Sequence, residues 1–140
     1  ADAVQQLLEG MVPELHELVE KKVLSKEEVR SVVKKRTDFE YRLRRRTPDK
    51  TDFKRYIQYE TTLDKLLQKR LSKLDNSKSS RRVKQNKYSC TRHIHFIFDR
   101  AVKKFKGDVN LWLEWVAFAK AASSSNVLSK IFARALQIHP

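Results

Sequence analysis

The chain has 140 residues, and its 31 Lys and Arg outnumber its 17 Asp and Glu, which gives a formal net charge of +14. Only two Gly and three Pro are present, so the composition favours long helices over a turn-rich β fold. No apolar run approaches the ~18 residues that a membrane span requires, and a single cysteine excludes an intrachain disulfide and suits a reducing compartment. A charge this basic indicates an anionic partner: nucleic acid, an acidic protein or an anionic membrane.

The N-terminal stretch predicts an amphipathic helix, because its apolar residues recur at three- and four-residue spacing. Pro13 lies inside this stripe and predicts a kink or a break. Residues 1–33 hold seven acids and four bases, whereas the remaining 107 residues carry +17. We therefore expect residues 1–48 to form a helical segment that caps the structure that follows, with its acids directed outward or toward the basic stretch Arg42–Arg46.

A second helix is predicted from about Lys26 to about Arg46. Ser25 and Glu28 form a capping box at its start, and Pro48 disfavours helix in the residue before it. Four arginines crowd its C-terminal end. Successive side chains on a helix diverge by about 100°, so these arginines cannot all face one partner. We expect some to pair with carboxylates of neighbouring helices, and contact with RNA is the alternative. The four are Arg42, Arg44, Arg45 and Arg46.

A third predicted helix starts near Thr51 and runs into a strongly basic segment, residues 69–92. This segment has nine Lys or Arg and a single acid, Asp75, and its middle has no apolar residue. Such a composition is typical of a solvated loop, because no burial offsets its ordering entropy. The alternative is a loop that contacts phosphates or docks on a protein. Its basic residues are Lys69, Arg70, Lys73, Lys78, Arg81, Arg82, Lys84, Lys87 and Arg92.

Three further helices are predicted after the basic segment. Apolar periodicity resumes at Ile94, Gly107 ends that helix, and Asp108 caps the next one. Residues 123–126 are predicted as a turn before the last helix. Two stretches in these helices are nearly the same and lie 34 residues apart: residues 97–102 read Ile-Phe-Asp-Arg-Ala-Val, and residues 131–136 read Ile-Phe-Ala-Arg-Ala-Leu. A period of that size indicates a helical solenoid built from antiparallel helix pairs.

Each predicted pair has an aromatic ladder on its first helix and an Ile-Phe-x-Arg-Ala motif on its second. Aromatic residues spaced by three lie on one helix face and form a ridge. We expect these side chains to form the core between helices rather than to stack on nucleic-acid bases. The predicted repeat core comprises Phe53, Tyr56, Tyr59, Ile97, Phe98, Ala101, Trp112, Trp115, Phe118, Ile131, Phe132 and Ala135.

The pattern of three spaced aromatics, Glu60 and a later Ile-Phe-x-Arg-Ala-Leu ending at Pro140 resembles the half-a-TPR (HAT) repeat of RNA-processing proteins. The resemblance covers roughly Phe53 to Pro140. It departs at Ala119, where the family usually has Glu, and in the 24-residue interruption over residues 69–92. It implies an all-α, α–α superhelix with residues 49–106 as a first repeat, residues 107–140 as a second, and further repeats beyond.

A more specific resemblance is carried by residues 37–47, by residues 52–60 and by the helix opening Pro13-Glu14-Leu15. Together they resemble the U3 small nucleolar RNA-associated HAT-repeat family of the small-subunit processome. This resemblance implies a nuclear, nucleolar scaffold in early ribosome biogenesis. It also implies β-propeller (WD40) partners and a U3 RNA and pre-rRNA particle contacted directly or indirectly.

Signs of catalysis or cofactor binding are missing from the sequence. Gly10 and Gly107 are the only glycines, so no Gly-rich phosphate loop exists, and Cys90, His93 and His95 are too few and too poorly spaced for a structural zinc site. We therefore expect that the chain is not an enzyme and that it has no cofactor, membrane or small-molecule substrate as a partner.

A protein-binding scaffold is the first hypothesis for the function of the chain. A direct RNA-binding module and a HAT adaptor of messenger RNA splicing or 3′-end processing are the alternatives.

Overall fold

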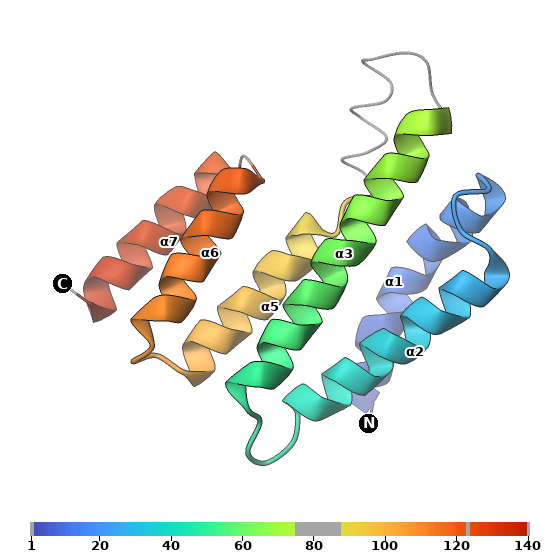
Figure 1. Ribbon diagram of the computed structural model, residues 1–140. Helices are drawn as coiled ribbons and strands as arrows, with labels where there is room; N and C mark the ends of the chain where they lie inside the picture. The colour runs from blue at the N-terminus through green and yellow to red at the C-terminus, as the bar shows by residue number, and fades with distance from the viewer. Residues whose placement is uncertain (1, 75–87, 123, 140) are drawn as a thin grey trace. The chain divides into compact units, whose positions relative to one another are not determined.

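The computed structural model describes residues 2–74, 88–122 and 124–139, which form six α-helices and no strand (Figure 1). The helices are α1 (Asp2–Glu20), α2 (Lys26–Leu43), α3 (Lys50–Leu74), α5 (Thr91–Lys104), α6 (Val109–Ala121) and α7 (Ser125–Ile138). The prediction of an all-α chain is confirmed for these residues. None of these helices is long and apolar enough to cross a membrane.

The chain divides into two compact units, Ala1–Cys90 and Thr91–Pro140. The division falls inside residues 49–106, the span that the sequence assigned to a first repeat. The assignment of repeats therefore stays a prediction.

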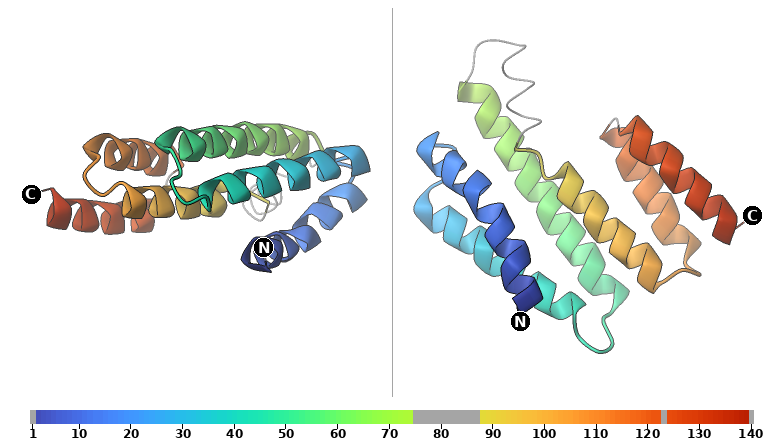
Figure 2. Two further views of the ribbon diagram at one scale, coloured as in Figure 1. Left: turned by 90° about the horizontal axis from the view of Figure 1, so that it is seen from below. Right: turned by 180° about the vertical axis from the view of Figure 1, so that it is seen from behind.

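In the first unit, α2 contacts both α1 and α3 and lies between them in Figure 2 (left). Val4, Leu15 and Leu18 of α1 are buried, and so are Leu63 and Leu67 of α3. Helix α1 continues through Pro13 without a break. Its buried residues lie on both sides of the proline, so packing holds the two halves together despite the lost hydrogen bond.

The ends of α2 follow from short-range chemistry. The capping box is confirmed: the Glu28 amide donates to Ser25 Oγ at 3.1 Å, and the Ser25 amide donates to Glu28 Oε1 at 2.9 Å. The helix ends at Leu43 rather than near Arg46, because Arg44 leaves the helical conformation and its amide is shared between the carbonyls of Glu40 and Tyr41.

In the second unit, α6 contacts both α5 and α7. Asp108 caps α6 as predicted, with Oδ1 accepting from the Asn110 amide at 3.0 Å. Helix α7 already begins at Ser125, so the second half of the turn predicted at 123–126 belongs to the helix. Ser123 lies outside the described residues.

The structure buries most of the predicted repeat core. Phe53, Tyr56, Ile97, Phe98, Ala101, Trp112, Trp115 and Ile131 are buried, and Tyr59, Phe118 and Ala135 are partly buried. Phe132, in contrast, is 44% exposed, and Leu136 and Ile138 on the same helix are also exposed. No helix follows α7 among the described residues, so the place of Phe132 in a repeat core stays a prediction.

Candidate interaction surfaces

A buried ion pair joins α2 to α3 in the first unit. Arg36 Nε donates to Glu60 Oε2 at 3.0 Å and Arg36 Nη2 donates to Glu60 Oε1 at 2.9 Å, so the pair is bidentate. Glu60 is 0% exposed and Arg36 is 7% exposed. Burial alone would lower the pKa of Arg36, but the Glu60 carboxylate outweighs it and keeps that pKa above its usual value. Arg36 therefore stays charged inside the core, and its two hydrogen bonds to Glu60 fix how α2 and α3 align.

A second buried contact lies one turn further along α2. The Tyr56 hydroxyl donates to Glu40 Oε2 at 2.9 Å, and Arg44 lies 3.7 Å from the other carboxylate oxygen of Glu40. Burial, followed by the nearby Glu40 and Glu60 carboxylates, raises the pKa of Tyr56 above its usual value. Tyr56 is thus held as a neutral donor.

The aromatic packing between α2 and α3 is repeated between α5 and α6, at positions 59 residues later in the chain. Phe39 stacks on Tyr56 (centroids 4.9 Å apart, planes at 7°) and Phe98 stacks on Trp115 (6.1 Å, 7°). Phe39 also meets Tyr59 at 5.7 Å, and Phe98 meets Phe118 at 5.8 Å. Two helix pairs in different units therefore use the same aromatic geometry.

The polar part of this arrangement changes between the two pairs. At the same offset, Arg36 corresponds to His95, and Glu60 corresponds to the buried Ala119. His95 Nδ1 accepts from Trp115 Nε1 at 2.9 Å, which replaces the ion pair by a neutral hydrogen bond. Burial lowers the pKa of His95 and favours the uncharged ring that this bond requires.

An ion-pair cluster links α5 to α7 in the second unit. Asp99 accepts from Arg134 Nη1 at 2.6 Å and lies 2.9 Å from Lys103 Nζ. Burial would raise the pKa of Asp99, but the hydrogen bonds from Lys103 and Arg134 outweigh it and lower that pKa. The Arg134 guanidinium also lies over the rings of Trp112 and Trp115, at 5.4 and 5.6 Å from their centroids.

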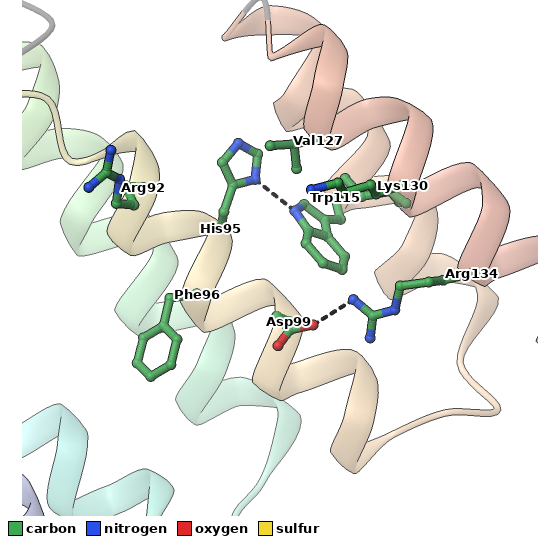
Figure 3. A pocket seen from close by; sticks show the side chains of 9 residues that line it. Arg92, His95, Phe96, Asp99, Trp115, Val127, Lys130 and Arg134 are labelled. Atoms are coloured by element: carbon green, nitrogen blue, oxygen red, sulfur yellow. Dashed lines mark hydrogen bonds and ion pairs between the residues drawn. The ribbon is translucent and has the colours of Figure 1, made fainter.

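A groove of about 270 Å³ lies between α5 and α7, over Trp115 of α6 (Figure 3). In Figure 3, His95 points from α5 toward Trp115, and Asp99 points toward Arg134 on α7. Arg92 and Phe96 of α5 and Val127, Lys130 and Ile131 of α7 complete the lining. The groove thus combines an apolar floor with basic groups at its edge.

The basic residues predicted to contact a partner do not gather at one place. Arg42, Arg44, Arg45 and Arg46 are exposed at the end of α2 and in the loop that leads to α3, whereas Lys69 and Lys73 are exposed near the far end of α3. At 1.5 Å per residue, about 30 Å of helix separates the two sets. Lys78, Arg81, Arg82, Lys84 and Lys87 lie outside the described residues, and Arg92 belongs to the second unit.

Arg70 has an internal role in the fold. Its Nη1 donates to Glu28 Oε1 at 2.9 Å and to the Val23 carbonyl at 2.8 Å, so it ties the end of α3 to the start of α2. The Arg70 hydrogen bond, supported by the Ser25 amide, lowers the pKa of Glu28 to about 2. Arg70 thus forms an Arg–carboxylate pair between helices, although the sequence had assigned it to the basic loop. The pairing between helices expected of the Arg42–Arg46 stretch stays a prediction, since Arg44 pairs with Glu40 of its own helix.

Two hydrogen bonds attach residues 88–90 to helices α1 and α3. The Tyr88 hydroxyl donates to Glu17 Oε2 at 2.6 Å, and the Cys90 amide donates to Asp64 Oδ1 at 2.9 Å. The buried Cys90 thiol lies 3.9 Å from Arg36 Nη2, and burial, followed by the Glu60 charge, raises its pKa. Cys90 and His95 therefore serve packing and hydrogen bonding in different units.

Sequence reasoning missed the roles of Arg36 and Glu40, and it named Glu60 only as part of a motif. A signal was present: Arg36 and Glu40 continue the buried stripe of α2 that includes Val32 and Leu43. A charged residue at an apolar-stripe position predicts a buried partner, because an unpaired charge there is too costly.

Comparison with known proteins places the chain in a family. The family described as U3 small nucleolar RNA-associated protein 6 matches residues 8–93, more than half of the chain. The chain belongs to this family. It is 39% identical, over its whole length, to the U3 small nucleolar RNA-associated protein 6 of Schizosaccharomyces pombe. It is 37% identical, over 99% of its length, to the homologues of Mus musculus and Homo sapiens. It spans only 28% of the first relative and 23% of the other two.

Proposed function

We propose that this chain is a non-catalytic scaffold in a U3 small nucleolar RNA-containing particle, working in the nucleolus during early small-ribosomal-subunit biogenesis. The observation that carries the proposal is the aromatic packing that recurs 59 residues apart, in the α2–α3 and the α5–α6 pairs. Repeated helix pairs bury their ridges against each other and leave extended outer faces for partners. The U3 small nucleolar RNA-containing particle is inferred from the family to which the chain belongs.

The same reasoning supports a HAT-type α–α superhelix, with residues 1–48 as its cap. Glu60, which occupies the Glu position of the HAT motif, is buried and hydrogen-bonded to Arg36 in the first unit. In the second unit, the hydrogen bond from Trp115 to His95 links the corresponding helices. We propose protein subunits of the particle as the main partners, WD40 β-propellers among them. The fit to this family leaves the splicing and 3′-end-processing alternatives without support.

Direct RNA binding is the second candidate, and one observation favours it. The exposed residues of α3 include five cations and no acid, while its three acids, Asp52, Glu60 and Asp64, are partly or fully buried. The five are Lys54, Arg55, Lys65, Lys69 and Lys73. Such a helix face suits a phosphate backbone.

Salt dependence separates the two candidates. Each phosphate contact releases counterions, so the affinity for RNA should fall by roughly 0.7 to 0.9 log units per contact for each tenfold rise in salt. We expect the purified chain to bind a structured RNA weakly at physiological salt and with a steep slope, and to keep its protein partners at high salt. The proposal would be abandoned if the chain bound RNA tightly at physiological salt and captured no protein subunit of the particle.

A matched pair of variants localises any RNA affinity. Lys65→Glu with Lys69→Glu alters α3, and Arg45→Glu with Arg46→Glu makes the same charge change in the loop after α2. If the RNA affinity is non-specific, both double variants reduce it equally. A loss confined to the α3 variant would favour RNA binding by that helix.

A further inference from the structure

We propose that the groove between α5 and α7 binds an acidic peptide segment of a partner protein, with one apolar side chain of that segment seated beside Val127, above the buried Ile131 and Trp115. The inference rests on the proposed scaffold function, because it names the class of protein segment that one face of the scaffold takes.

The size of the groove fits one side chain. Its volume of about 270 Å³ lies below the range of roughly 300–1,000 Å³ typical of small-molecule sites. Trp115 and Ile131 are buried beneath it, and Val127 is partly exposed at its wall. An aliphatic or aromatic side chain would cover this apolar floor, whereas a cofactor would not be enclosed.

The charge of the groove calls for an anionic segment. Arg92, Lys130 and Arg134 line it, against the single acid Asp99. Asp99 is already neutralised by Arg134 and Lys103. Within the described part of the chain, neither Arg92 nor Lys130 takes part in an ion pair, and both are exposed. Acidic residues on either side of the apolar anchor would face these two cations.

The aromatic residues favour a peptide over a nucleic acid. Base recognition in single strands depends on an accessible aromatic face. Trp115 is stacked on Phe98, with Arg134 over its ring at 5.6 Å. Phe96 is 41% exposed, but Arg100 lies over its ring at 4.9 Å. Trp115 therefore offers no free ring face on which a base could stack, and Arg100 covers one face of Phe96.

The floor of the groove is held in place before any partner arrives. Trp115 Nε1 donates to His95 Nδ1, and His95 Nε2 lies 3.1 Å from Ser124 Oγ at the start of α7. These bonds connect α5, α6 and the beginning of α7. Because the floor is preorganised, a bound side chain need not order it.

The test uses a displayed library of random peptides selected against the purified chain. We expect the enriched peptides to carry acidic residues around one apolar residue. A synthetic peptide from that set is then titrated by fluorescence anisotropy. Lys130→Glu and Val127→Trp, which reverse a charge and fill the groove, should each weaken binding about tenfold, equivalent to about 1.4 kcal/mol.

Two variants of the same unit serve as controls. Lys106→Glu makes the same charge change in the exposed loop before α6, and Leu113→Trp places the same bulky ring on the exposed side of α6. Both should bind the peptide within about twofold of the unaltered chain. Circular dichroism verifies folding, and Arg92→Glu replaces any groove variant that fails to fold.

Three results would overturn the inference: enriched peptides that are not acidic, equal losses in groove and control variants, or no enrichment at all. The groove would instead be an RNA site if Val127→Trp abolished binding of an oligouridine and left the peptide unaffected. Failure of the proposed scaffold function would look different from failure of the groove inference. It would appear as the absence of protein subunits from particles purified through the unaltered protein, independently of the peptide results.

Discussion

Breaking the buried Arg36–Glu60 pair should cost more stability than any other single polar change in the first unit. Two hydrogen bonds of 3.0 and 2.9 Å join the groups, and Glu60 is fully buried. With N and O 2.9 Å apart, the attraction is about 6 kcal/mol at an effective dielectric constant of about 20. Desolvation offsets much of it, so Glu60→Leu or Arg36→Met alone should lower the free energy of unfolding by about 3–5 kcal/mol, because one buried charge loses its partner.

Urea unfolding followed by far-UV circular dichroism measures this free energy for both single variants and the double variant. The double variant should be more stable than the sum of the single effects predicts, by a coupling of about 3 kcal/mol. Arg70→Met, which breaks the half-exposed pair with Glu28, is the control and should cost at most about 1 kcal/mol. Additive losses, or single losses no larger than that of the control, would refute the reasoning.

Three further predictions concern other parts of the fold. Because burial lowers the pKa of His95 in the folded state, the second unit should lose stability as the pH falls below about 6.5. His95→Gln should abolish this pH dependence. Both tryptophans lie in this unit, so unfolding followed by tryptophan fluorescence at several pH values measures its stability. The thiol of Cys90 should react with an alkylating reagent far more slowly in the folded chain than in urea, since it is buried and its pKa is raised; equal rates would contradict its burial. Deleting residues 1–24 should cause aggregation, because α1 covers apolar residues of α2; a soluble, equally helical truncation would argue against a capping role.

The helices were predictable because their signals are local. Ser25 with Glu28 and Asp108 set helix starts through bonds to amides two or three residues away, and the sequence contains everything those bonds need. The outcome at Pro13 depended on tertiary packing of residues on both sides, which periodicity alone does not weigh. The early end of α2 at Leu43 is a difference of a few residues, as expected where a helix terminus frays.

The candidate surfaces were less predictable, because they depend on which helices meet. Arg70 looked like part of a basic loop, but the fold places it beside Glu28, 42 residues earlier in the chain. The groove over Trp115 combines residues of three helices. Two of its cations, Lys130 and Arg134, stand alone in the sequence without any charge run, and the third, Arg92, is the last residue of the basic segment 69–92. Only the contact between α6 and its two neighbours brings them together.

Nuclease digestion of purified particles tests the central claim most directly. Particles purified through the protein that contains this chain are treated with ribonuclease, and the proteins that stay bound are identified by mass spectrometry. If helical faces hold the chain to protein subunits, those subunits remain associated after the RNA is removed. Release of all subunits on digestion, with the chain left alone, would show that RNA contacts hold it and would contradict the account.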